Sequence, residues 1–213
     1  HGLPIQVDDR EKVLDLAYVD DVVESFLAAM DGTVAPDADG YCRVPVTYRR
    51  TLGEIVDLLG RFEANRKTLV VPSFEDPFIR KLYGTWLSFL PTDGFSYPLE
   101  MRRDERGWLA EFIKSASFGQ VFVSRTEPGV TRGNHWHHTK AEKFLVVSGE
   151  GVVRFRQVDG NEVIECPVSG DELRVVDIPT GYTHSISNTG TRELITIFWS
   201  DEVFDPARAD TYY

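Results

Sequence analysis

The spacing of hydrophobic positions changes once along this chain, near residue 94. Before that point, short apolar runs typical of strands alternate with segments in which apolar residues recur every three or four positions, as on one face of a helix. Beyond it, apolar and polar residues alternate with a period of two, and turn residues recur roughly every 8–12 positions. The pattern predicts an α/β part over residues 1–94 and a mainly β part over residues 95–213.

The first part opens with a predicted strand at residues 13–19 and a helix after it. Asp20 is the expected N-cap of this helix, and Gly32 is placed to end it in the left-handed conformation. The apolar positions that recur at helical spacing are Val22, Val23, Phe26, Leu27 and Met30.

A second unit repeats this order. Residues 41–48 read as a strand, and Thr51 with Glu54 three positions on forms a capping box for the next helix. A third helix is predicted from residues 73–77 to residue 90. The sequence Pro-Thr-Asp-Gly at 91–94 ends it, and we place the domain boundary there.

The second part contains many short strands and no helical period, which predicts a sandwich or a barrel. Hairpin turns are expected at residues 159–161 and 188–190, where Gly and Asn occur together. The predicted strands are 108–113, 120–125, 142–147, 152–156, 162–166 and 193–199.

Composition narrows the class of protein. The chain has 213 residues, 42% of them hydrophobic, which is enough for one large or two small globular domains. No apolar run approaches the roughly 18 residues of a membrane span. The only cysteines, Cys42 and Cys166, form no CxxC pair, so we expect a cytoplasmic protein. The net charge of −11 argues against nucleic-acid or membrane binding, but not against an anionic small substrate.

Three of the five histidines fall within four positions of the β part. On a strand His135 and His137 share one face and His138 takes the other. Glu142 shares a strand face with Phe144 and Val146, and His184 shares one with Ile186 and Asn188. An ionisable side chain at such a core-facing position is costly unless something compensates it. For each histidine alone, a hydrogen bond to a backbone carbonyl is the simpler interpretation. A divalent cation bound by His135, His137, Glu142 and His184 would account for all four.

The spacing of this set resembles the two cupin motifs. Gly129, His135-Trp136-His137, Glu142 and Gly149 match the first, and Pro179, Gly181, His184 and Asn188 match the second. The glycine that usually opens the second motif would fall at Leu173, whereas this chain has Gly170. The resemblance implies a cupin domain over residues 95–213, a double-stranded β-helix or jelly-roll barrel.

A closer likeness spans nearly the whole chain, which resembles the CapF family of bifunctional capsular-polysaccharide enzymes. The runs that carry it are 133–140, 142–149, 175–184, 204–206 and 210–212, with 4–7, 18–23 and 51–59 in the first part. The resemblance implies that the cupin domain epimerises a UDP-4-keto-6-deoxy-N-acetylhexosamine at C3. A short-chain dehydrogenase domain then reduces C4 with NADPH, toward a UDP-N-acetyl-L-fucosamine precursor. It also implies zinc or another divalent metal, and a homodimer.

The first part departs from that family. It has no Gly-rich strand–turn–helix fingerprint and no Tyr-x-x-x-Lys pair, so the cofactor cradle and the proton donor of the reductase are missing. Residues 1–94 resemble only the C-terminal part of the dehydrogenase domain, without its Rossmann core. We interpret the chain as a piece of the longer enzyme and expect it neither to bind NADPH nor to reduce a keto sugar.

Epimerisation next to a ketone needs a base and an acid. Tyr182 and His138 are the candidates, although packing for Tyr182 and an exposed or interface position for His138 are the simpler interpretations. The metal-free sugar-nucleotide epimerases of the cupin superfamily suggest another arrangement. The stretch Arg132-Gly133-Asn134-His135 is similar to the Arg-Gly-x-His stretch of those enzymes. The similarity implies that His135 is the base and that Arg132 binds substrate. His137 and Glu142 favour the metal, which could also be purely structural.

Other interpretations stay open. Arg154 and Arg156 share a strand face that could attract a diphosphate or be simply solvated. The chain could bind a sugar nucleotide without turnover, or it could be a metal-dependent cupin dioxygenase, since such enzymes often use two histidines and a carboxylate.

Overall fold

The computed structural model describes residues 5–213, so the predictions that fall on residues 1–4, including part of the run 4–7, lie outside it. The chain divides into two compact units. A helical unit contains the residues up to 65 together with 74–95, and a β unit contains residues 66–73 and 96–213. Each is described by itself.

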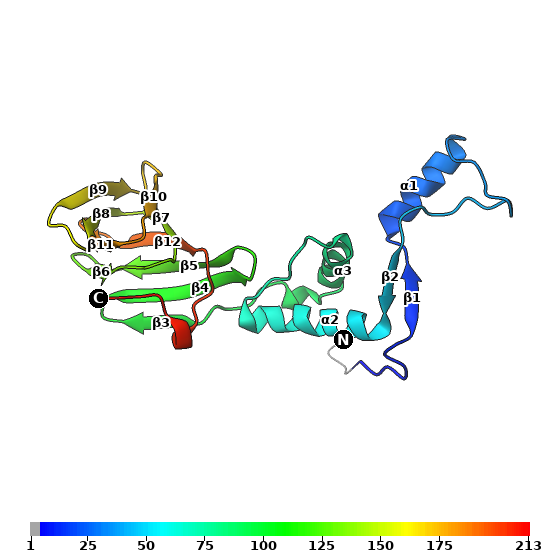
Figure 1. Cartoon of the computed structure of the whole chain (residues 1–213), viewed down its shortest axis with the longest axis horizontal. Helices are drawn as coiled ribbons and strands as arrows, with labels where there is room; N and C mark the ends of the chain where they lie inside the picture. The colour runs from blue at the N-terminus through cyan, green and yellow to red at the C-terminus, as the bar shows by residue number, and fades with distance from the viewer. Residues whose placement is uncertain (1–4) are drawn as a thin grey trace. The chain divides into compact units, whose positions relative to one another are not determined.

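The helical unit has a two-stranded antiparallel sheet and three helices (Figure 1). Its core is built on Leu58, Phe62 and Phe78, with Phe62 fully buried against the rings of Tyr83 and Trp86. Its elements are β1 (Val13–Leu16), α1 (Val19–Met30), β2 (Tyr48–Thr51), α2 (Leu52–Thr68), α3 (Pro77–Ser88) and the 3-10 helix η1 (Thr92–Gly94).

The start of α1 differs from the prediction. Tyr18, not Asp20, is the N-cap residue, and its side chain makes no capping hydrogen bond. The amide of Val22 already donates to the carbonyl of Tyr18 (3.1 Å), so Asp20 lies inside the first turn. Gly32 follows the helix with φ of 67°, which confirms its expected left-handed conformation.

The second predicted strand is wrong over residues 41–47. The amide of Asp37 donates to the carbonyl of Tyr41 (2.8 Å) in a turn, and β2 begins only at Tyr48 because the four residues of β1 pair with 48–51. The capping box after it is confirmed. The amide of Thr51 donates to Glu54 Oε2 (2.7 Å), and that of Glu54 donates to Thr51 Oγ1 (3.1 Å).

The third helix, α3, is shorter than predicted. It begins at Pro77, after Asp76 accepts a hydrogen bond from the amide of Phe78 (2.9 Å), and it ends at Ser88 rather than at residue 90. Among the described residues, no helix combines the length and the apolar character that a membrane span requires.

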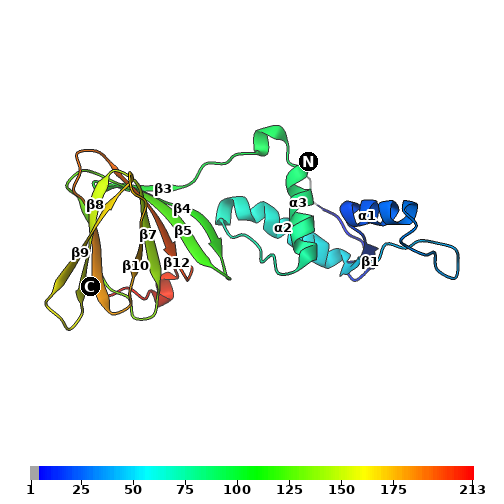
Figure 2. The ribbon, with the colours of Figure 1, turned by 90° about the horizontal axis from the view of Figure 1, so that it is seen from above.

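The β unit is a sandwich of two antiparallel sheets (Figure 1 and Figure 2). The larger sheet has the strand order β10-β7-β12-β5-β4-β3 and the smaller has β6-β11-β8-β9. The strands are β3 (Met101–Asp104), β4 (Gly107–Ser115), β5 (Gly119–Thr126), β6 (Thr131–His135), β7 (Glu142–Ser148), β8 (Glu150–Gln157), β9 (Val163–Ser169), β10 (Val175–Ile178), β11 (Tyr182–Asn188) and β12 (Leu194–Ser200); the 3-10 helix η2 (Pro206–Arg208) follows.

The mainly β, cupin-like jelly-roll class is therefore confirmed, but not its closure. The described strands form two separate sheets rather than one hydrogen-bonded ring, so the domain is a jelly-roll-like sandwich and not a closed barrel. All six predicted strands are present. Four more (β3, β6, β10 and β11) lie outside them, because their sequences are short or rich in polar residues and lack a clean hydrophobic alternation.

The sandwich core lies between the two sheets. It is formed by Phe144, Val146, Val153, Phe155, Val168, Ile178, Ile186, Leu194 and Phe198. In β7, Glu142 is the first of the core-facing positions and is buried like Phe144 and Val146 after it, as the alternation predicts. Residues 69–71 add to this unit through hydrogen bonds to the backbone of Lys114 (2.8 and 2.9 Å).

Candidate metal centre

Four ionisable side chains converge at one end of the sandwich. His135 ends β6, His137 follows it, Glu142 begins β7 and His184 lies in β11. Because β6 pairs with β11 so that His135 faces His184, the two histidines are neighbours across the smaller sheet, while β7 brings Glu142 from the larger one. One ligand atom from each residue lies within 4.8 Å of all the others.

The backbone beside His135 is irregular and closely packed. Gly133 and Asn134 both have positive φ (98° and 63°), and the pairing of β6 with β11 shifts between His184 and Ser185. A Cβ at position 133 would lie 2.8 Å from the carbonyl oxygen of His184, so this approach of the two strands needs glycine. His135 and His137 still lie on one side, with ring centroids 5.0 Å apart.

The two buried histidines are oriented by backbone carbonyls. Nδ1 of His137 lies 2.5 Å from the carbonyl oxygen of Asp210, and Nδ1 of His184 lies 3.4 Å from that of Tyr182. When Nδ1 donates to a carbonyl, Nε2 carries the lone pair. Both Nε2 atoms face Glu142 Oε2, at 3.2 and 3.5 Å, yet neither has a hydrogen-bond partner. A hydrogen bond to a backbone carbonyl thus accounts for Nδ1 of each of these two rings but not for Nε2.

The pKa values of two members of the cluster, Glu142 and His135, are shifted by their surroundings. Burial alone would raise the pKa of Glu142, but its contacts with His137, His184 and Lys140 outweigh this and hold the pKa below its ordinary value. Burial, with His184 and His137 nearby, lowers the pKa of His135 to about 4. At neutral pH the site therefore offers a carboxylate and an uncharged His135.

These residues fit a divalent cation. Imidazole nitrogen and carboxylate oxygen bind zinc at about 2.0–2.2 Å, so two donors of a tetrahedral zinc lie about 3.4 Å apart. The four ligand atoms lie within 4.8 Å of one another, so a shift of about an ångström in the side chains would complete the site. It also supplies the unpaired Nε2 atoms and the anion that such an ion would satisfy. When bound, the ion would be held by His135, His137, Glu142 and His184.

The two predicted proton-transferring residues lie outside the cluster. His138 is exposed, with its ring 6.4 Å from that of Trp136. Tyr182 is half-buried and packs against the sandwich core.

Three arginines singled out in the sequence are engaged within the fold. The guanidinium of Arg132 donates from Nε to Thr126 Oγ1 (3.0 Å) and from Nη2 to the Arg125 carbonyl (3.2 Å), and burial lowers its pKa. Its side chain is only 13% exposed. Arg154 pairs with Glu165 (2.7 Å), and Arg156 donates to the carbonyl of Gly160 (3.0 Å).

Two residues that belong to the centre were not singled out in the sequence. Lys140 places Nζ 3.1 Å from Glu142 Oε1, with only 12% of its side chain exposed. No strand periodicity marks Lys140, because it lies in the loop between β6 and β7. Asp210 carries no such signal either, because it reaches His137 from 73 residues away.

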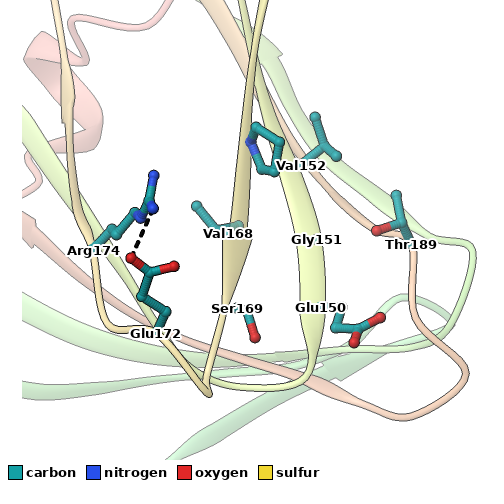
Figure 3. A pocket seen from close by; sticks show the side chains of 9 residues that line it. Glu150, Gly151, Val152, Val168, Ser169, Glu172, Arg174 and Thr189 are labelled. Atoms are coloured by element: carbon teal, nitrogen blue, oxygen red, sulfur yellow. Dashed lines mark hydrogen bonds and ion pairs between the residues drawn. The ribbon is translucent and has the colours of Figure 1, made fainter.

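A separate pocket of about 390 Å³ lies at the other end of β8 and β11 from His184 (Figure 3). Glu150, Gly151 and Thr189 line one side, and Glu172 and Arg174, joined by an ion pair (2.7 Å), line the other. The lining carries two carboxylates and one guanidinium, and one of the carboxylates is already paired with it.

Comparison with known proteins places the β unit in a family. The profile described as "Polysaccharide biosynthesis C-terminal domain" matches residues 102–212, which is more than half of the chain and includes the whole cluster and Asp210. The chain belongs to this family. Within the polysaccharide biosynthesis C-terminal domain family, its similarity to CapF confirms the resemblance inferred from the sequence.

A structure of CapF with the inhibitor 3-isopropenyl-tropolone is 52% identical, with a TM-score of 0.95 over 99% of this chain and 60% of that one. The capsular polysaccharide assembling protein CapF from Staphylococcus aureus is also 52% identical, with a TM-score of 0.93 over 99% and 61%. A UDP-2-acetamido-2,6-beta-L-arabino-hexul-4-ose reductase from Pseudomonas aeruginosa is 38% identical over 99% of this chain and 56% of its own length. The chain thus spans little more than half the length of these relatives.

Proposed function

We propose that the β unit is a metal-dependent epimerase that inverts C3 of a UDP-4-keto-6-deoxy-N-acetylhexosamine, in the synthesis of a capsular or surface polysaccharide. The observation that carries the proposal is the convergence of three imidazoles on one carboxylate, with two buried Nε2 atoms that have no protein partner. The substrate class comes from the relatives, one named for a UDP-linked 4-ketohexose derivative and the other for capsular polysaccharide assembly.

A hydrogen on the carbon next to a ketone is weakly acidic, and its removal builds negative charge on the carbonyl oxygen. A divalent cation bound here would act as a Lewis acid toward that oxygen. The protein must supply a base on one face of the sugar and an acid on the other. His138 and Tyr182 remain the predicted pair for these roles.

The ion we propose is zinc, because three imidazole nitrogens and one carboxylate oxygen suit it and can leave a coordination position open for substrate. We also propose a homodimer in the cytoplasm. Reduction of C4 with NADPH belongs, in this proposal, to the longer enzyme and not to this chain.

The test is proton exchange at C3. The chain is incubated with zinc and UDP-2-acetamido-2,6-dideoxy-4-keto-hexose in deuterated water, and deuterium at C3 is followed by NMR. We expect incorporation, because the proton passes to a protein base that exchanges with solvent. His137→Ala and Glu142→Gln should each lower the rate by at least about 100-fold, the scale of a lost catalytic contribution.

The same variants separate the alternatives, provided that circular dichroism shows them folded. On a metal-free route with His135 as base and Arg132 as substrate ligand, exchange would survive in both variants and fail in His135→Ala. Tight binding of the sugar nucleotide without exchange in the intact chain would contradict the epimerase and favour a binding module. Bound iron with oxygen consumption would favour a dioxygenase.

A further inference from the structure

The segment 210–212 lies alongside the segment that carries His137. Trp136 and Tyr212 form an isolated antiparallel bridge, with amide-to-carbonyl distances of 2.8 and 3.0 Å in the two directions. Their rings stack with centroids 4.7 Å apart. These contacts fix residues 210–212, here called the strap, directly beside the ligand loop of residues 135–140.

The carboxylate of Asp210 holds the backbone of this loop. Oδ1 accepts from the amide of His138 (2.9 Å), and Oδ2 accepts from the amides of Thr139 (2.7 Å) and Lys140 (2.8 Å) and from the Thr139 hydroxyl (3.0 Å). Hydrogen bonds to a charged acceptor are about twice as strong as neutral ones. One side chain thus fixes three consecutive residues that lie between two members of the cluster, His137 and Glu142.

Asp210 also reaches both of those members. Its carbonyl oxygen lies 2.5 Å from Nδ1 of His137, which turns Nε2 toward the centre. Its carboxylate fixes the backbone of Lys140, whose Nζ holds Glu142 Oε1 at 3.1 Å and leaves Oε2 for the histidines. Asp210 thus orients His137 through its carbonyl oxygen and supports the contact between Lys140 and Glu142 through its carboxylate.

We propose that Asp210 is a positioning residue of the metal centre, and that the strap sets how tightly the centre binds its ion. The inference rests on the metal site of the proposed function and adds to it the part of the chain that aims the ligands. Partners that orient a ligating histidine are worth about 10- to 100-fold in metal affinity when removed.

The experiment compares Asp210→Ala with a matched control, Asp205→Ala. Asp205 precedes the same strap, and its carboxylate accepts from the amide of Ala207 (2.9 Å) and from Arg208 (3.2 Å), but it contacts no member of the cluster. The affinity of the whole 213-residue chain for Zn²⁺ is measured by competition with a chromophoric chelator. Co²⁺ loading is followed by its visible absorption. We expect about a 10- to 100-fold loss for Asp210→Ala and an altered Co²⁺ spectrum, with Asp205→Ala like wild type.

Asp210→Asn serves as the conservative variant. Its amide oxygen, placed where Oδ2 lies, can keep three of the four hydrogen bonds, so affinity should recover most of the loss. A merely structural role for Asp210 would lower the melting temperature of the metal-free protein and leave the zinc affinity and the Co²⁺ spectrum of folded Asp210→Ala and Asp210→Asn unchanged. That result would overturn the positioning role while the site itself stands. If wild type binds neither Zn²⁺ nor Co²⁺, the metal centre of the proposed function fails instead.

Discussion

Nζ of Lys140 lies 3.1 Å from Oε1 of Glu142, while Oε2 of the same carboxylate faces His137 and His184. One oxygen of this carboxylate therefore contacts the Lys140 ammonium, and the other faces the histidines of the cluster. Both side chains are largely buried, at 12% and 7% exposure. Lys140 is the only lysine or arginine that the contacts of the described residues place on Glu142.

Replacing Lys140 with Met should therefore destabilise the metal-free protein more than the zinc-loaded one. Removing one partner of a buried pair leaves the other charge uncompensated and costs about 3–5 kcal/mol. A bound ion would compensate Glu142 and reduce that loss. Thermal unfolding of wild type and variant, with EDTA and with excess zinc, measures the difference.

Lys143→Met is the control for this change. Lys143 pairs with Asp177 on the exposed side of β7, where both side chains are about half exposed or more, so the pair contributes at most about 1 kcal/mol. We expect a small loss that does not depend on zinc. Equal losses for Lys140→Met with and without zinc would contradict metal binding next to Glu142.

Gly133→Ala should disrupt the centre without removing any ligand. The new Cβ would lie 2.8 Å from the His184 carbonyl oxygen and 3.0 Å from Cα of Ser185, so β6 must move away from β11 and His135 with it. The residue also has positive φ, which costs a side chain about 1–2 kcal/mol. We expect weaker zinc binding and lower stability, measured by chelator competition and denaturant unfolding.

Gly129→Ala separates strain from collision. Gly129 also has positive φ (75°), but its Cβ would meet nothing within 4 Å. It should lose stability through strain alone and keep the zinc affinity of wild type. Similar zinc affinities for the Gly133 and Gly129 variants would show that the close approach of β6 and β11 does not position the ligands.

The helical unit should lose stability at alkaline pH through Lys81. Its Nζ donates to both oxygens of Asp21 (2.7 and 2.6 Å), which, with Tyr48, raises the pKa of Lys81 above its usual 10.5. A pKa raised by folding means that the folded state holds the proton more tightly. The contribution is therefore complete below about pH 10.5 and is lost as the pH rises through the folded value.

The measurement is denaturant unfolding followed by helix ellipticity at several pH values, for wild type and Asp21→Asn. The stability difference between them should be constant from pH 7 to 10 and shrink above it. Asp57→Asn is the control, because Asp57 pairs with Arg10 (2.7 Å), whose guanidinium stays charged over this range. If the stability difference between wild type and Asp21→Asn stayed constant above pH 10, the pH dependence could not be assigned to Lys81.

The sequence by itself determined the features that depend on neighbours along the chain. The burial of Glu142 with Phe144 and Val146 follows from strand alternation, and the Thr51–Glu54 capping box follows from a spacing of three. The set His135, His137, Glu142 and His184 was found from motif spacing, and the structure brings all four together. The hydrophobic period and the motif spacing are local properties of the sequence, so they can be recognised without knowing the path of the chain.

Only the tertiary structure decided what supports that set. Asp210 reaches the ligand loop across 73 residues, and Arg132 turns its guanidinium toward Thr126 and the backbone of Arg125. The division of the β unit into two sheets likewise cannot be predicted from the sequence of any single strand. These features depend on which distant segments the jelly-roll path places side by side, and a hydrogen bond between such segments leaves no periodic signal in either of them.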